Sequence, residues 1–311
     1  MVGNAAGRMD KAMTVKIVTL RALEPGPVFT VLGAVHGNER CGPEAIRRLI
    51  DGVDRGEVAL TRGTLLLVPV ANPRAYEQGV RFVERNLNRQ LYPKDVKTHY
   101  EDHLDPILCD LLDKTQVLLD LHSYTSQGGP FIFSGGNDAK ELAFAQALGV
   151  SDFVTGWSEA FGSSDASSDA KREAQGTTEY ARSRGAIAVT LECGHHTNAD
   201  AADIGHRATL RALVHLDMLD AGCAAALHVP RDALIGPPRY VRMKSVFRRE
   251  AGASFAKPWQ HFDAVAKGEP MAVLASGETI AAPEAGFIVL PKDRAAPGEE
   301  WFYFGAVASG I

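Results

Sequence analysis

Hydrophobic residues in the first two thirds of the chain gather in short continuous runs, separated by stretches with helical periodicity. The runs predict buried strands over residues 29–35, 64–70, 117–121, 130–133 and 186–191. The stretches between and after them predict helices over residues 43–53, 103–114, 140–148, 176–184 and 200–226, with a loop over 162–170. Apolar strands that alternate with helices are typical of a largely parallel sheet covered on both faces. We therefore expect an α/β fold.

The pattern changes after His228. Eight of the 16 prolines follow this residue and interrupt short β-like pieces such as 240–246 and 286–290, while long helical patterns stop. Proline ends or borders regular elements because it lacks a backbone donor. We expect a domain boundary near residue 228, with an α/β domain over 1–228 and a small β-sandwich or barrel-like domain over 229–311.

Polar side chains stand where the predicted strands end. His36 and Glu39 follow the first strand and Asn72 the second, His122 follows the third, and Glu192 closes the fifth. In parallel sheets, ligands bind beyond the carboxyl ends of the strands. We expect these side chains to meet at one edge of the sheet.

Three of these residues offer donor atoms that suit zinc. Imidazole nitrogen and carboxylate oxygen bind Zn²⁺, and catalytic zinc sites use three protein ligands. His122 alone would be read as a core histidine, but together with His36 and Glu39 it completes a ligand set for one Zn²⁺ per chain. Asp120 shares the face of His122 in a strand, so it is a candidate to orient that ring.

Other polar residues allow more than one interpretation. Glu192 at the end of a buried strand is either a salt-bridged strand end or a general base that takes a proton from water and returns it to a leaving amine. Arg81, Arg85 and Arg89 lie within nine residues. They form either a solvated face or a site for carboxylate and oxyanion groups, which guanidinium binds well.

Composition narrows the class of protein. The 311 residues are 45% hydrophobic and 23% charged, with a net charge of -5, and the basic residues are scattered, so nucleic acid and anionic membranes are not expected partners. No apolar stretch approaches the length of a membrane span. Residues 1–13 lack the apolar core of a signal peptide, and the four cysteines form no Cys-x-x-Cys motif. We expect reduced thiols and a cytoplasmic location.

The order of motifs resembles a known family. His36-Gly-Asn-Glu39, Asn72-Pro-Arg74, Arg81-Phe followed by Leu87-Asn-Arg89, Asp120-Leu-His122 and Leu191-Glu-Cys-Gly194 occur in sequence, and 281–286 resembles a C-terminal signature. This order is similar to that of the succinylglutamate desuccinylase/aspartoacylase family of zinc-dependent amide hydrolases. The resemblance implies a zinc carboxypeptidase-like α/β/α domain with a mixed, largely parallel sheet, followed by a small C-terminal β-rich domain.

The resemblance also implies roles for individual residues. His36, Glu39 and His122 would bind zinc, Glu192 would be the catalytic base, and Arg81 would polarise the scissile carbonyl. Asn88 and Arg89 would hold a substrate carboxylate.

The chain departs from the family pattern at two places. Asn86 stands where members often have an acidic residue, which bears on substrate identity, and His195-His196 follow Glu192-Cys-Gly194. The histidines are candidates for substrate or metal contact, although surface positions are commoner. Tyr303 is a candidate to reach the cleft, although an aromatic cluster of this kind usually packs in a core.

We expect hydrolysis of the amide bond of an N-acyl amino acid or related small N-acyl amine. Two alternatives are a metallocarboxypeptidase acting on peptides and a non-catalytic binding protein on an enzyme fold. The acyl group, the amine and the physiological metal are left open, and the sequence allows a homo-oligomer.

Overall fold

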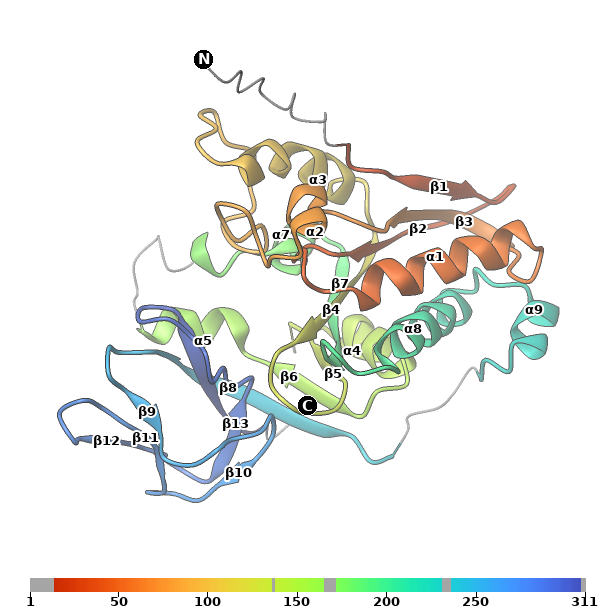
Figure 1. Cartoon of the computed structure of the whole chain (residues 1–311). Helices are drawn as coiled ribbons and strands as arrows, with labels where there is room; N and C mark the ends of the chain where they lie inside the picture. The colour runs from red at the N-terminus through yellow and green to blue at the C-terminus, as the bar shows by residue number, and fades with distance from the viewer. Residues whose placement is uncertain (1–13, 136–137, 165–171, 231–235, 309–311) are drawn as a thin grey trace, which may run out of the picture.

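A computed structural model of the chain describes residues 14–135, 138–164, 172–230 and 236–308. Its dominant feature is one eleven-stranded sheet with the strand order β1-β3-β2-β4-β7-β5-β6-β8-β14-β13-β10 (Figure 1). A second sheet of three strands, β12-β11-β9, belongs to the C-terminal part of the chain and lies near β10 and β13. The fold is the mixed, largely parallel α/β sheet with a C-terminal β-rich region that the sequence predicts.

The centre of the large sheet is parallel. The strands β2 (Glu24–Gly33), β3 (Arg62–Val68), β4 (Val117–Tyr124) and β7 (Ile187–His195) run in one direction. Every residue of β4 is buried, because helices cover both of its faces. Leu118 and Ala188 belong to the core on one face, whereas Leu119 and Val189 belong to the core on the other. This alternation explains why the strands read as continuous apolar runs.

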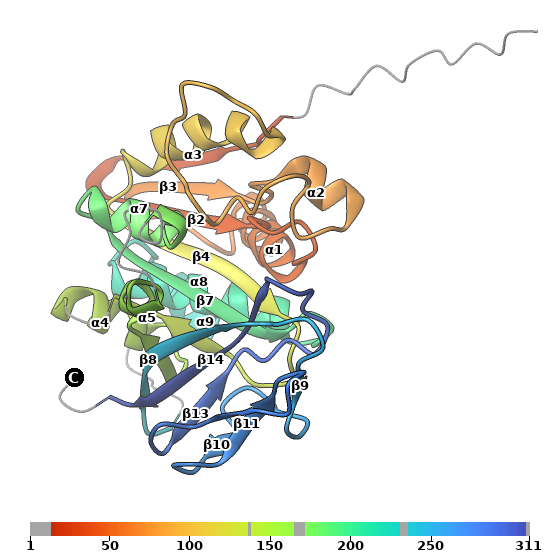
Figure 2. The ribbon, with the colours of Figure 1, turned by 90° about the vertical axis from the view of Figure 1, so that its left-hand side faces the viewer.

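Helices form the two outer layers (Figures 1 and 2). Core contacts place α1 (Cys41–Asp54), α4 (Ala139–Ala147) and α8 (Ala201–His215) on one face. The opposite face carries α3 (Asp105–Leu112) and α7 (Thr177–Ser183). The long connection between β3 and α3 contains the short α2 (Pro73–Gln78) and a 3-10 turn, η1 (Tyr100–His103). No helix among the described residues has the length and hydropathy to cross a bilayer.

The rest of the large sheet changes direction. It contains β5 (Phe131–Phe133), antiparallel to β7, then β6 (Asp152–Thr155), which is parallel to both β5 and β8 (Arg239–Arg248). The antiparallel strands β14 (Glu300–Val307), β13 (Gly286–Val289) and β10 (Ala264–Val265) complete it. A further edge strand, β1 (Val18–Arg21), pairs with β3. The C-terminal strands thus continue the sheet of the first 228 residues, and the division into two domains stays a prediction.

The small sheet packs against the beginning of β14. It consists of β9 (Ser254–Phe255), β11 (Pro270–Val273) and β12 (Thr279–Ala281). Trp301, Phe302 and Phe304 are buried in the core that the small sheet shares with β14. Tyr303 belongs to a neighbouring core together with Phe131. The alternation along β14 therefore turns Tyr303 away from Phe302 and Phe304, and a register shift between Glu300 and Phe302 accompanies the placement of Trp301 in their core.

Two predicted elements differ from the structure. The helix predicted over 200–226 is wrong as one element, because the chain forms α8 and then α9 (Ala221–Ala226) with a turn between them. Asp217 there has a φ of 54°, and Leu219 pairs with Leu60, far away in sequence. The loop predicted over 162–170 begins inside α5 (Trp157–Ser164), and residues 165–170 lie outside the described part of the chain.

Candidate metal and substrate site

His36 and Glu39 lie on a tight turn that follows β2. The backbone N–H of Glu39 donates to the carbonyl of His36 over 3.2 Å, and the N–H of Gly37 donates to the carbonyl of Arg81 over 3.1 Å. A Cβ on Gly37 would lie 2.1 Å from the carbonyl carbon of Ala75. Only glycine fits there, so the close packing against α2 holds the two candidate ligands on one turn.

Three donor atoms converge at this turn. His36 Nδ1 lies 2.8 Å from Glu39 Oε1 and 3.1 Å from Nδ1 of His122, which is 3.0 Å from Glu39 Oε2. All three side chains are buried. Two ligands about 2.1 Å from a tetrahedral Zn²⁺ ion are roughly 3.4 Å apart, so a small widening would admit the ion. The structure therefore brings together the three residues predicted to hold a metal.

Outer contacts orient both rings. His36 Nε2 lies 3.0 Å from Asn86 Oδ1, and His122 Nε2 lies 2.9 Å from Asp120 Oδ2. Burial lowers the pKa of His36 to about 3, which keeps it in the neutral form that binds metals. Burial opposes charge on His122 as well, but Asp120 and Glu39 raise its pKa well above the ordinary value. The carboxylates around His122 thus attract a positive charge, which a divalent cation would satisfy.

Glu192 stands beside His122 in the parallel ladder of β4 and β7. Its side chain is 8% exposed, and Oε2 has no hydrogen-bond partner among the described residues. Burial raises the pKa of this carboxyl to about 8. An ionisable group held in this way can exchange a proton near neutral pH.

The three arginines of the 81–89 segment have separate surroundings. Arg81 is partly exposed, and its Nη1 donates to Glu39 Oε1 over 3.2 Å. Arg85 faces away from the cluster of histidines and pairs with Asp102 and Asp105. The solvated face considered for this segment is not formed, since Arg85 and Arg89 are largely buried.

Two side chains position this segment in ways that the sequence did not indicate. The carboxylate of Glu101 is buried and accepts the backbone N–H groups of residues 83, 84 and 85. Asn88 lines the pocket, and its Oδ1 accepts the N–H of Thr177 over 2.9 Å at the start of α7. Only the fold reveals these contacts, because the partners are separated by at least 16 positions in the sequence, and by 89 in the contact between Asn88 and Thr177.

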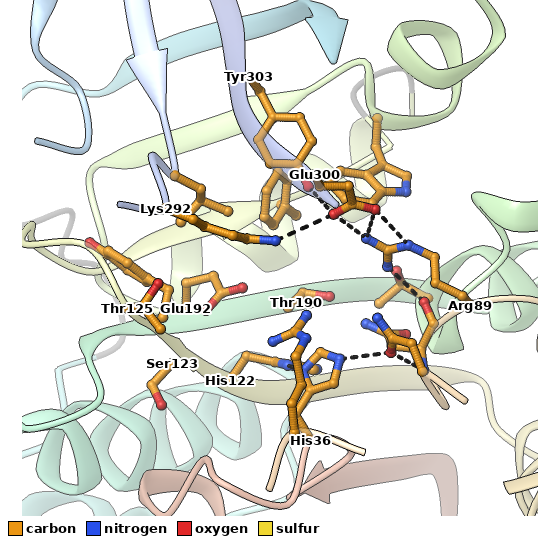
Figure 3. A pocket seen from close by; sticks show the side chains of 18 of the residues that line it. His36, Arg89, His122, Ser123, Thr125, Thr190, Glu192, Lys292, Glu300 and Tyr303 are labelled. Carbon is orange, nitrogen blue, oxygen red and sulfur yellow. Dashed lines mark hydrogen bonds and ion pairs between the residues drawn. The ribbon is translucent and has the colours of Figure 1, made fainter. Parts of the chain in front are cut away.

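Arg89 meets a carboxylate from the C-terminal strands. Its Nη2 lies 2.9 Å and 3.1 Å from the two oxygens of Glu300, and Nε lies 3.3 Å from Oε1 (Figure 3). Tyr303, buried at the same place, donates its hydroxyl to Glu300. Lys292 reaches toward Glu300 from the other side, with Nζ 3.6 Å from Oε2. The sequence indicated Tyr303 as a candidate for the cleft but gave no signal for Lys292 or Glu300.

Most of the groups predicted to act on substrate line one cavity of about 340 Å³, whose lining includes His36, Arg81, Asn86, Asn88, Arg89, His122, Glu192, Lys292, Glu300 and Tyr303. His36, His122 and Glu192 lie on one side of it, and Glu300 and Tyr303 lie opposite (Figure 3). His196 also lines the cavity and contacts Ser123 Oγ through Nδ1 at 2.8 Å. His195 is not among the lining residues and contacts Thr197. The volume suits a small molecule rather than a folded polypeptide segment.

Comparison with known proteins agrees with this geometry. Residues 25–216, well over half of the chain, match the model of the succinylglutamate desuccinylase/aspartoacylase catalytic domain. The chain belongs to the succinylglutamate desuccinylase/aspartoacylase family. Among family relatives, a probable aspartoacylase of Prochlorococcus marinus (strain MIT 9301) is 27% identical over 128 residues, which span 38% of this chain and 41% of that protein. A succinylglutamate desuccinylase of Idiomarina loihiensis is 38% identical over 74 residues, 24% of this chain and 21% of that protein.

Solved structures of the family share the fold over nearly the whole chain. The product-bound ectoine utilization protein EutE from Ruegeria pomeroyi is 21% identical, with a TM-score of 0.69, and the match covers 94% of this chain and 88% of that one. A succinylglutamate desuccinylase/aspartoacylase structure from Rhodobacter sphaeroides is 19% identical, also with a TM-score of 0.69, covering 94% and 90%. The match includes the C-terminal strands, which the family's catalytic-domain model leaves out.

Proposed function

We propose that this protein is a zinc-dependent deacylase that hydrolyses the amide bond of an N-acyl amino acid or related small N-acyl amine. The observation that carries the proposal is the buried cluster of His36, Glu39 and His122 beside the unpartnered carboxylate oxygen of Glu192. Membership of the succinylglutamate desuccinylase/aspartoacylase family supports the same chemistry.

His36, Glu39 and His122 would hold the ion. When bound there, Zn²⁺ supplies Lewis-acid chemistry, which polarises a carbonyl and makes water more acidic. The neutral ring of His36 and the ionised Glu39 are the forms that such a ligand set requires. Asp120 and Asn86 keep the two rings in place.

Glu192 would move the proton. It takes a proton from the attacking water and returns it to the nitrogen of the leaving amine, which balances the hydrolysis of one amide bond. Arg81 lines the cavity and would stabilise the negative charge that develops on the carbonyl oxygen. Asn88 and Arg89 stay predicted substrate residues, although the guanidinium of Arg89 is already paired with Glu300.

A deacylation screen tests the proposal. Purified protein loaded with one equivalent of Zn²⁺ is assayed against N-acetyl, N-succinyl and N-formyl amino acids, with C-terminal peptide substrates alongside. We expect release of free amino acid from at least one N-acyl amino acid and negligible cleavage of peptides. Faster cleavage of peptides would favour the metallocarboxypeptidase alternative. Failure to retain any divalent metal would favour a non-catalytic binding protein.

A further inference from the structure

Most cationic side chains around the cavity are already paired with carboxylates of the protein. Among the described residues, the cations that line it are Arg81, Arg89, Arg182, Arg248 and Lys292. Arg182 lies 2.9 Å from Glu141 and 3.1 Å from Glu179, and Arg248 lies 2.7 Å from Glu173. Arg81 pairs with Glu39 in the metal cluster. A substrate anion therefore has few cations with unfilled donors to bind.

All three nitrogens of the Arg89 guanidinium already donate hydrogen bonds, as do those of Arg182. In Arg89, Nε and Nη2 donate to Glu300, and Nη1 donates to the carbonyl of Asn88 over 2.8 Å. The group also lies 4.7 Å from the centre of the Trp157 ring. Burial favours the neutral acid of Glu300, yet Arg89 and Lys292 hold its pKa far below the ordinary value. Glu300 thus stays ionised and occupies the fork that a substrate carboxylate would need.

The ammonium group of Lys292 has N–H donors that Glu300 does not fill. Its Nζ lies 3.6 Å from Glu300, which is too long for a hydrogen bond. The side chain extends into the cavity between Glu192 and Glu300, and it is 30% exposed (Figure 3). An ammonium group carries three donors that turn freely, so it can bind a carboxylate that approaches from the cavity.

We propose that Lys292 binds the carboxylate of the substrate and that Glu300 allows only one such group, so that the substrate is an N-acyl derivative of an amino acid with an uncharged side chain. Arg89, Lys292 and Glu300 together carry one net positive charge. A second carboxylate would meet Glu300 without a cation of its own, and like charges at this separation repel strongly in a partly buried site. The inference rests on the deacylase function proposed above.

Pairs of substrates that differ only in charge test the inference. N-acetylasparagine is compared with N-acetylaspartate, and N-acetylglutamine with N-acetylglutamate, using the zinc-loaded full chain. We expect kcat/KM to be at least tenfold higher for the uncharged member of each pair. Equal values, or a preference for the acids, would overturn the inference.

Variants assign the effect to the two residues. Glu300→Gln keeps the shape of the side chain and should reduce the discrimination at least fivefold, since it removes the negative charge. Lys292→Met should raise KM at least tenfold with kcat changed less than threefold, and Lys292→Arg should restore most of the affinity. N-acetylmethioninamide, which has no carboxylate, should lose at least fivefold less kcat/KM in Lys292→Met than N-acetylasparagine loses. An unchanged KM for N-acetylasparagine in Lys292→Met would refute the role of Lys292, even if Glu300→Gln proved too unstable to assay.

Two failures can be told apart. If the zinc-loaded enzyme hydrolyses neither these four substrates nor any N-acyl amino acid of the deacylation screen, the proposed deacylase function is in error. Calorimetric binding of the free amino acids then decides the present inference, because asparagine should bind at least tenfold more tightly than aspartate. Hydrolysis with a preference for the acids would leave the deacylase function standing and overturn the inference alone.

Discussion

Replacement of Asn86 by aspartate should strengthen metal binding. Asn86 Oδ1 lies 3.0 Å from both His36 Nε2 and the backbone N–H of Asn88. A backbone N–H only donates, so the amide atom that faces it is oxygen, and His36 must then donate from Nε2. The lone pair of His36 Nδ1 therefore faces Glu39 and His122. Aspartate keeps both acceptor contacts and adds one negative charge behind the ring.

The size of the effect follows from distance and charge. A carboxylate oxygen in that place is about 7 Å from an ion on the other side of the imidazole. The ionised Glu39 offsets one of the two charges of Zn²⁺, and the remaining unit charge interacts with the carboxylate at this separation by about 2.4 kcal/mol at an effective dielectric constant near 20. The side chain is only half-buried, so solvent screens part of this energy. Partners that contact metal-binding histidines usually change affinity by about 10- to 100-fold. We expect Asn86→Asp to bind Zn²⁺ about 10- to 60-fold more tightly.

Competition with a chromophoric chelator at neutral pH measures the affinity without reference to catalysis. Asn86→Leu is the matched control, because it removes the acceptor from His36 and should bind Zn²⁺ more weakly than wild type. Thermal melts of the apo proteins show whether each variant is folded. Equal or weaker Zn²⁺ binding by a folded Asn86→Asp variant would refute the contact between Asn86 and His36 as the cause.

Three further results are expected. His36→Ala should lose most of its bound Zn²⁺, and metal analysis that finds full occupancy would remove this ligand from the set. Glu192→Gln should retain Zn²⁺ but lower kcat by roughly 100-fold or more, and near wild-type turnover would exclude it as the base. Burial, with Arg81 and Arg89, lowers the pKa of Lys292 to about 8 against the opposing effect of Glu300. The ammonium form of Lys292 therefore prevails below pH 8, and kcat/KM for N-acyl amino acids should fall above this pH. In Lys292→Arg the fall should shift to higher pH. A wild-type profile that stays flat to pH 10 would contradict this assignment.

The structure changes the effect that is expected of Arg89→Ala. As a clamp for a substrate carboxylate, Arg89 would show mainly a KM defect when removed. Its loss would also leave Glu300 buried without its guanidinium partner, and breaking a buried pair in this way costs about 3–5 kcal/mol. Reduced stability should therefore accompany any change in KM, so this variant alone cannot assign the clamp.

Elements with strong local patterns could be predicted. The strands β2, β3, β4 and β7 are apolar on both faces, and helices flank them, so their positions follow from short stretches of sequence. The strands β1 and β6 were missed, since each is only four residues long and depends on pairing with distant partners. The break between α8 and α9 was missed for a similar reason, because it depends on the bridge between Leu60 and Leu219.

The metal cluster could be predicted because its members are tied to the ends of predictable strands. His36 and Glu39 share one turn, and His122 follows the same edge rule, so the topology of a parallel sheet is enough to bring them together. Asp120 likewise follows from the alternation of side chains along β4. Local sequence thus contains the residues to which we assign the hydrolytic chemistry.

The predicted substrate site depends on contacts that the tertiary structure alone creates. Arg89 and Glu300 are 211 residues apart, and only the pairing of β6 with β8 and of β8 with β14 brings the second to the first. The same strand pairings place Lys292 and Tyr303 at the cavity. The sequence by itself determined the fold class and the predicted metal ligands, because these follow from periodicity and strand ends. The tertiary structure decided which cations line the cavity and which of them are paired, because charge balance depends on partners that no local pattern encodes.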